Sequence, residues 1–81
     1  MSTEIRLEDA AWAGVEEGAE ALLEEWLVGE GDGVAAGQAL VNVMLLKASY
    51  EIESPVGGTV SRVLVAEGES FTRGQPLAEI V

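Results

Sequence analysis

Residues 25–43, EWLVGEGDGVAAGQALVNV, recur without a gap as residues 62–80, RVLVAEGESFTRGQPLAEI. Leucine, glycine, glutamate and glutamine positions repeat at an offset of 37, from Leu27 and Leu64 to Leu40 and Leu77. Each copy has an aliphatic run, an acidic glycine-rich segment, a Gly-Gln step and a second aliphatic run, which predicts strand, reversal, strand. A solenoid needs roughly three or more repeats, so we expect the two copies to pack face to face around one core.

The length of 81 residues predicts one small domain spanning residues 1–81, with repeat halves at about 20–43 and 57–80. Residues 8–26 have a helix-favouring composition, but residues 22–28 overlay the β-branched run at residues 59–65. We therefore predict a strand at residues 20–28. Residues 9–18 are expected to be loop with one helical turn, and residues 5–7 a short first strand.

Some residues of the repeat are expected to serve the fold alone. Gly37 and Gly74 should take positive φ in turns, and Gln38 and Gln75 should be structural. Trp12 and Trp26 should pack in the core or at its edge, since two separated aromatic residues make no stacking platform.

The chain carries 4 basic and 15 acidic residues, for a net charge of −11. Ten of the acidic residues lie within residues 1–32. This balance argues against nucleic acid and anionic lipid as partners. The opening Met-Ser-Thr-Glu-Ile-Arg shows no signal-peptide pattern, and no apolar stretch is long enough to span a membrane. We expect a soluble, cytoplasmic domain that is monomeric in isolation.

The composition gives little support to an enzyme. With no His and no Cys, the chain lacks the usual nucleophile–base pairs and the usual zinc ligands, so we expect no catalytic residues and no metal site. Glu16-Glu17 and Glu24-Glu25 are adjacent, and on a strand adjacent residues point to opposite faces. The segment 29–33 resembles an ion-binding loop only superficially, and its repeat at 66–70 indicates a turn.

Lys47 is the only lysine in the chain, and it lies between the two copies. Residues 39–46 and 49–54 are predicted strands, so Lys47-Ala48 should fall at the reversal between them, although the turn type is open. Ser54-Pro55 and Gly57-Gly58 mark the passage into the second copy. Without further information, a lysine at a hairpin tip is usually a solvated charge.

The ordered set of motifs resembles the lipoyl and biotinyl attachment domains over residues 5–81. The set comprises Trp26-Leu27-Val28, Glu30-Gly31-Asp32, Gly37-Gln38, Lys47-Ala48, Ser54-Pro55-Val56, Glu67-Gly68-Glu69 and Gly74-Gln75-Pro76-Leu77. It is most similar to the lipoyl domains of 2-oxoacid dehydrogenase acyltransferases. The resemblance implies an all-β fold: a flattened barrel or sandwich of two four-stranded antiparallel sheets, with the lysine on a protruding hairpin.

The residues beside the lysine bear on the cofactor. Biotinyl domains carry Met-Lys-Met and lipoyl domains usually carry Asp-Lys-Ala, whereas this chain has Leu46-Lys47-Ala48. Lipoylated glycine-cleavage H-proteins also place an apolar residue before the lysine. The apolar run Met44-Leu45-Leu46 is expected to be buried strand or, alternatively, a docking surface.

The resemblance therefore implies a non-catalytic swinging-arm carrier, with lipoic acid attached to Lys47. Its partners would be a lipoate–protein ligase or lipoyl transferase and enzymes of the 2-oxoacid dehydrogenase or glycine-cleavage type. Two alternatives remain open: a biotin carboxyl carrier domain, and an unmodified scaffold or binding module of the same fold. An excised domain would have the same sequence as a free subunit.

Overall fold

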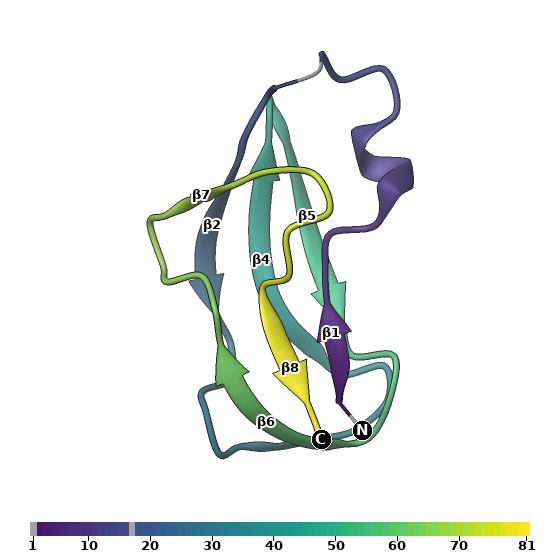
Figure 1. Ribbon diagram of the computed structural model, residues 1–81, viewed down its shortest axis with the longest axis vertical. Coiled ribbons are helices and arrows are strands. Elements are labelled where there is room, and N and C mark those ends of the chain that lie inside the picture. The colour runs from purple at the N-terminus through teal and green to yellow at the C-terminus, as the bar shows by residue number, and fades with distance from the viewer. Residues whose placement is uncertain (1, 17) are drawn as a thin grey trace.

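The computed structural model describes residues 2–16 and 18–81 of the chain (Figure 1). This part of the chain is built almost entirely of strands, with one short 3₁₀ helix. In chain order the elements are β1 (Thr3–Ile5), η1 (Asp9–Trp12), β2 (Ala21–Trp26), β3 (Gly33–Val34), β4 (Ala39–Leu45), β5 (Ala48–Glu53), β6 (Gly58–Val63), β7 (Ser70–Phe71) and β8 (Ala78–Ile80).

The strands form two antiparallel four-stranded sheets, ordered β1-β8-β6-β3 and β5-β4-β2-β7. The predicted all-β class and the two four-stranded sheets are confirmed. Each sheet is open at its edge strands, so in the described residues the architecture is a sandwich and not a closed barrel. The short strand β7 pairs with β2, and β3 pairs with β6, so each copy of the repeat lends a strand to the sheet of the other.

Side chains join the two copies in the same reciprocal way. The backbone N–H of Trp26 donates a hydrogen bond to the Glu67 carboxylate at 2.8 Å. At the equivalent place in the other copy, the N–H of Val63 donates to the Glu30 carboxylate at 2.8 Å. The repeated glutamates are therefore explained by the fold, because each accepts a hydrogen bond from a backbone N–H of the other copy.

The Gly-Gln steps also serve the backbone. Gly37 and Gly74 have φ of 85° and 80°, in the region that glycine enters without strain. Gln38 and Gln75 each accept, through the side-chain oxygen, a hydrogen bond from the backbone N–H three residues earlier, at 3.0 and 3.1 Å. Both predictions, positive φ for the glycines and a structural role for the glutamines, are confirmed.

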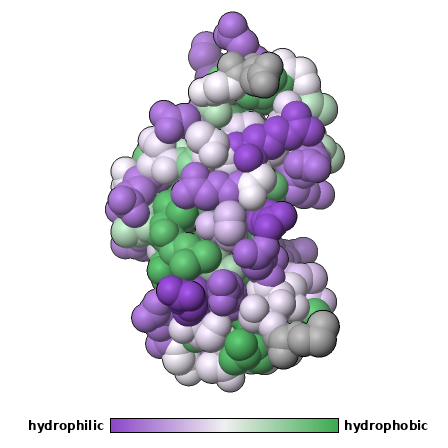
Figure 2. Space-filling model, viewed as in Figure 1, coloured by the Kyte–Doolittle hydropathy of each residue, from purple (hydrophilic) through white to green (hydrophobic). Residues whose placement is uncertain are grey.

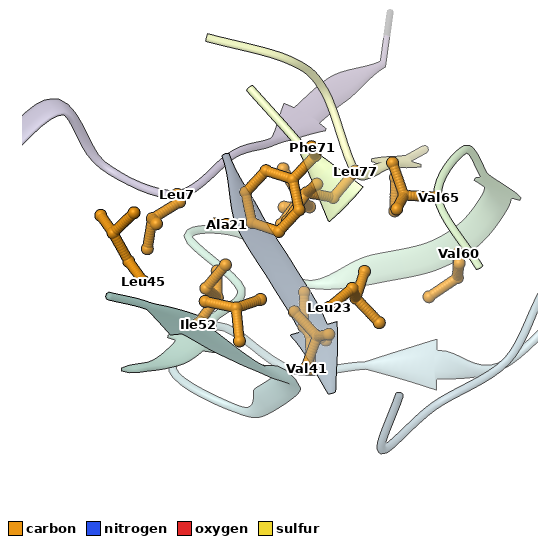
Figure 3. Packing of buried hydrophobic residues seen from close by; sticks show 14 of the residues in the cluster. Leu7, Ala21, Leu23, Val41, Leu45, Ile52, Val60, Val65, Phe71 and Leu77 are labelled. Carbon is orange, nitrogen blue, oxygen red and sulfur yellow. The ribbon is translucent and has the colours of Figure 1, made fainter. Parts of the chain in front are cut away.

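The core lies between the two sheets, and Figure 3 shows its side chains converging from both. Leu23, Leu40, Leu77 and Phe71 are fully buried. Trp12 from η1 caps this core and meets Phe71 edge to face, with ring centroids 6.2 Å apart at 79°. Because Trp12 is the last residue of η1, the long loop that leads from η1 to β2 is anchored to the core at its start.

The element boundaries test the sequence predictions directly. The strand predicted at residues 20–28 is β2, and the helical turn expected within residues 9–18 is η1. The first strand was predicted at residues 5–7 but lies at Thr3–Ile5, so that prediction is wrong by two residues. Leu7 is buried like Ile5, but β1 pairs with β8 only from Thr3 to Ile5. Leu7 therefore packs in the core although it lies after the last residue of β1 that pairs with β8.

Figure 2 shows mostly hydrophilic side chains on one face, with a larger hydrophobic area at mid-height. Trp26 is half-buried, and its Nε1 donates to the carbonyl oxygen of Val65 at 2.8 Å. Both tryptophans therefore pack, as predicted, and neither forms an exposed platform. In the part of the chain that the structure describes, no helix has the length and hydrophobicity needed to cross a membrane.

Candidate functional site

Lys47 lies at the tip of the hairpin formed by β4 and β5. The two strands pair from Ala39 opposite Glu53 to Leu45 opposite Ala48, which leaves Leu46 and Lys47 as a two-residue turn. The lysine therefore lies at a strand reversal, as predicted, but the turn is Leu46-Lys47 and not Lys47-Ala48, because Ala48 already pairs with Leu45 as the first residue of β5. Figure 1 shows this tip at the end of the molecule opposite to the two chain termini.

Leu46 gives the turn an uncommon backbone. Its φ is 58°, the one positive φ among the described residues that are not glycine. A type I′ turn needs positive φ at both central residues, so the Leu46-Lys47 turn is not of that type. A leucine in this region is strained by roughly 1 kcal/mol, because its Cβ crowds the carbonyl oxygen.

The apolar run before the lysine is divided between the core and the surface. Leu45 is buried, Met44 is half-buried, and Leu46 has 66% of its surface exposed. The expectation of a buried strand therefore holds for Leu45, whereas Leu46 presents an exposed apolar side chain next to the lysine. The strand alternation explains this difference, because Leu45 still points inward and the turn begins after it.

Lys47 is exposed, and its amine takes part in neither of the ion pairs found in the described residues. These pairs are Arg6 with Glu4, and Arg73 with Asp9 at 3.5 Å, both between exposed side chains. An exposed primary amine on a tight hairpin is sterically open to acylation. The rigid ladder below it fixes its position, while its four-carbon stem supplies reach.

A groove of about 360 Å³ lies beside the lysine, between the hairpin tip and a segment made of the end of η1 and the first residues of the loop after it. Lys47, Leu46 and Tyr50 line it from the hairpin, Ala11 lines it from η1, and Val15 from the loop. No motif within residues 11–15 predicts that they lie beside Lys47, since this contact arises only in the tertiary structure.

The acidic candidates form no site for a metal. In residues 2–16 and 18–81, no three acidic side chains gather closely enough to hold one. Asp32 accepts a hydrogen bond from Gly29 N at 2.8 Å, and Glu69 accepts one from Ala66 N at 2.7 Å. The segment 29–33 and its repeat are therefore turns closed by their own carboxylates, as predicted.

Glu24 and Glu25 do not point to opposite faces as predicted. A register shift between Leu23 and Glu25 marks a bulge in β2, and both glutamates are exposed and line one groove with Asn42. The bulge inserts one residue and so interrupts the strand alternation on which the prediction rested. Of the other pair, Glu16 is exposed and Glu17 lies outside the described residues.

The profile of the Biotin_lipoyl family, described as "Biotin-requiring enzyme", matches residues 11–80. The chain belongs to the biotin/lipoyl attachment family. The match includes the hairpin, both copies of the repeat and the loop that borders the groove. The observed pair of four-stranded sheets agrees with the family resemblance seen in the sequence.

Relatives of this family member are acyltransferase components of dehydrogenase complexes. It is 42% identical over 60 residues to a dihydrolipoyllysine-residue acetyltransferase component of the pyruvate dehydrogenase complex from Zymomonas mobilis, covering 73% of this chain and 14% of the relative. The corresponding component from Staphylococcus aureus is 36% identical over 80 residues, covering 99% and 18%. A dihydrolipoyllysine-residue succinyltransferase component of the 2-oxoglutarate dehydrogenase complex from Rickettsia bellii is 30% identical over 61 residues, covering 75% and 15%. The chain thus spans less than a fifth of the length of each relative.

Proposed function

We propose that residues 1–81 form a single lipoyl carrier domain, with lipoate attached through an amide to the ε-amine of Lys47. The observation that carries this proposal is the position of the only lysine: it is exposed at the tip of a two-residue hairpin in a member of the biotin/lipoyl family. Amide formation would remove the lysine charge and lengthen its flexible stem into an arm. A bound lipoyl group would supply a dithiolane that accepts an acyl group reductively.

The residues of this chain would position the arm without taking part in bond making. The β4–β5 ladder holds the attachment point, and the sequence contains no histidine or cysteine that could serve as a general base or nucleophile. Tethering the carried group raises its concentration at each enzyme that the arm reaches. The domain is therefore proposed to be a carrier, with catalysis left to its partners.

The names of the three relatives favour lipoate over biotin, since each is a dihydrolipoyllysine-residue acyltransferase component. By the same reasoning, the proposed partners are enzymes of a 2-oxoacid dehydrogenase complex and a lipoate-attaching ligase or transferase. Ala48 after the lysine agrees with this choice, because the biotinyl pattern has methionine there.

The test is intact-mass spectrometry of the protein after separate incubation with a lipoate ligase and lipoate, and with a biotin ligase and biotin. We expect one lipoyl adduct, located at Lys47 by peptide mapping, and no biotinyl adduct. The matched control is Lys47→Arg, which keeps the charge but cannot form the amide and should remain unmodified. A biotinyl adduct would replace the proposal with a biotin carrier, and no adduct in either reaction would favour a scaffold.

A further inference from the structure

The groove beside Lys47 differs in charge from the other grooves of this acidic protein. Apart from Lys47 itself, every residue that lines it is uncharged. Four other grooves each include at least one glutamate, among them Glu4, Glu16, Glu24 and Glu51. In a chain with a net charge of −11, a groove without carboxylates is suited to a neutral apolar occupant.

The lining of the groove is also apolar. Half-buried Ala11, Val15 and Tyr50 pack against the core and form part of its wall, and exposed Leu46 belongs to the same lining. Its volume of about 360 Å³ lies at the small end of the range of roughly 300–1,000 Å³ that is typical of small-molecule sites. A short aliphatic group would therefore fit better here than a large ligand.

We propose that this groove receives the lipoyl arm of Lys47 itself, in an equilibrium between a docked and a free arm. The inference rests on the proposed function. Once the amide has formed, the arm is neutral like the groove, and its aliphatic chain and dithiolane gain by leaving water. Because Lys47 is part of the lining, docking is intramolecular and needs little intrinsic affinity. The docked arm is shielded from reaction with free thiols, and a partner enzyme draws on the free form.

The test uses an arm installed without a ligase. Because Lys47 is the only lysine, an activated ester of lipoate acylates its ε-amine and the α-amino group alone. Lys47→Arg, acylated only at the α-amino group, supplies the signals and the reduction rate of an arm that is not at the groove. Amide resonances of ¹⁵N-labelled protein then report docking, and the rate of dithiolane reduction by dithiothreitol reports shielding.

Two variants place a charge in the groove, and one is a matched control. Ala13→Glu puts a carboxylate on an exposed residue of the groove lining, and Leu46→Asp does the same from the hairpin. Ala36→Glu makes the first substitution on an exposed residue outside this groove. Resonances of core residues such as Leu23 check that each variant folds.

We expect lipoylation of the parent and of Ala36→Glu to shift the amides of Ala11, Val15 and Ala48. These shifts should be lost in both groove variants. If docked arms outnumber free arms by about four to one, the Lys47 arm of the groove variants should be reduced about fivefold faster than the Lys47 arm of the parent, after the phase due to the α-amino arm, known from Lys47→Arg, is subtracted. Equal reduction rates in all forms, with no shifts at the groove, would overturn the inference. A third outcome separates the two proposals. If the chemically installed arm docks but a lipoate ligase adds no lipoyl group to the protein, the docking inference stands and the proposed function is refuted.

Discussion

The two ends of the molecule hold equivalent places in the repeat, but only one is closed by a turn. β4 pairs with β5 as β8 pairs with β1: Val41 lies opposite Ile52, and its repeat counterpart Ala78 lies opposite Ile5. At one end the chain continues from strand to strand through Leu46 and Lys47, whereas the other end holds the two termini (Figure 1). The β1–β8 pair therefore forms between the two ends of the chain, whereas β4 and β5 are joined by the Leu46-Lys47 turn.

This comparison separates residues that serve the fold from those left for function. Both copies use the same glutamate, glycine and glutamine residues. The hydrogen bonds that the glutamate and glutamine side chains accept have nearly equal lengths in the two copies. The lysine tip has no counterpart in the second copy, and its one unusual backbone angle falls on a leucine. Substitutions at equivalent positions of the two copies therefore test this difference.

The largest effect is expected for Phe71→Ala, compared with Val34→Ala at the equivalent position. Phe71 is fully buried and meets Trp12 near the lysine end, whereas Val34 is smaller and slightly more exposed. We expect a loss of about 3–5 kcal/mol for Phe71→Ala and about 1–2 kcal/mol for Val34→Ala, measured by urea denaturation. Equal losses would mean that the aromatic pair does not give the lysine end extra stability.

The repeat explains why much of the fold could be predicted. Composition alone favours a helix within residues 8–26, but the overlay of residues 22–28 on the β-branched residues 59–65 correctly indicated a strand, which is β2. The physical reason is that equivalent positions of the two copies have similar surroundings, so a strand pattern that is clear in one copy also applies to the other. The strand patterns at residues 39–46 and 49–54 likewise indicated that Lys47 lies at a strand reversal.

Other features depend on contacts that no local pattern records. The bulge at Glu24 places two adjacent glutamates on one groove, and β1 begins two residues earlier than its apolar residues suggest. The groove beside Lys47 depends on a loop that is more than 30 positions away in the chain. The positive φ of Leu46 runs against its residue type and so could not be predicted from it.

The next effect concerns Gly58, near the terminal end, and Ala21, its counterpart near the lysine end. A Cβ on Gly58 would lie 2.3 Å from the backbone oxygen of Val81, whereas Ala21 is accommodated with its side chain buried. We expect Gly58→Ala to destabilise by about 3 kcal/mol through this clash with backbone. The reverse change, Ala21→Gly, should cost about 1 kcal/mol. Thermal unfolding of both variants measures the difference, and a harmless Gly58→Ala would show that the backbone at Val81, after β8, can move aside.

Gly37 and Gly74 should behave alike, since they hold the same turn in the two copies. No atom lies within 4 Å of a Cβ built on either residue, so strain at φ of 85° and 80° is the expected penalty. We expect Gly37→Val and Gly74→Val each to lower stability on the order of 1 to 3 kcal/mol. Gly33→Val is the control, because Gly33 has open space and no positive φ. Unchanged melting of both turn variants would defeat the claim.

The smallest effect is expected at the lysine tip itself, and its sign is opposite. Asparagine tolerates positive φ better than leucine, and Leu46 gives up little packing because 66% of its surface is exposed. Leu46→Asn should therefore stabilise the domain by about 0.5–1 kcal/mol in urea denaturation. Leu27→Asn serves as the control, since Leu27 is also exposed but has no positive φ, and it should bring no gain. A gain at Leu46 alone would mean that the tip retains a residue unfavourable for folding, as expected where the side chain serves the attached arm. A loss at Leu46 would instead assign this leucine to the packing of the hairpin.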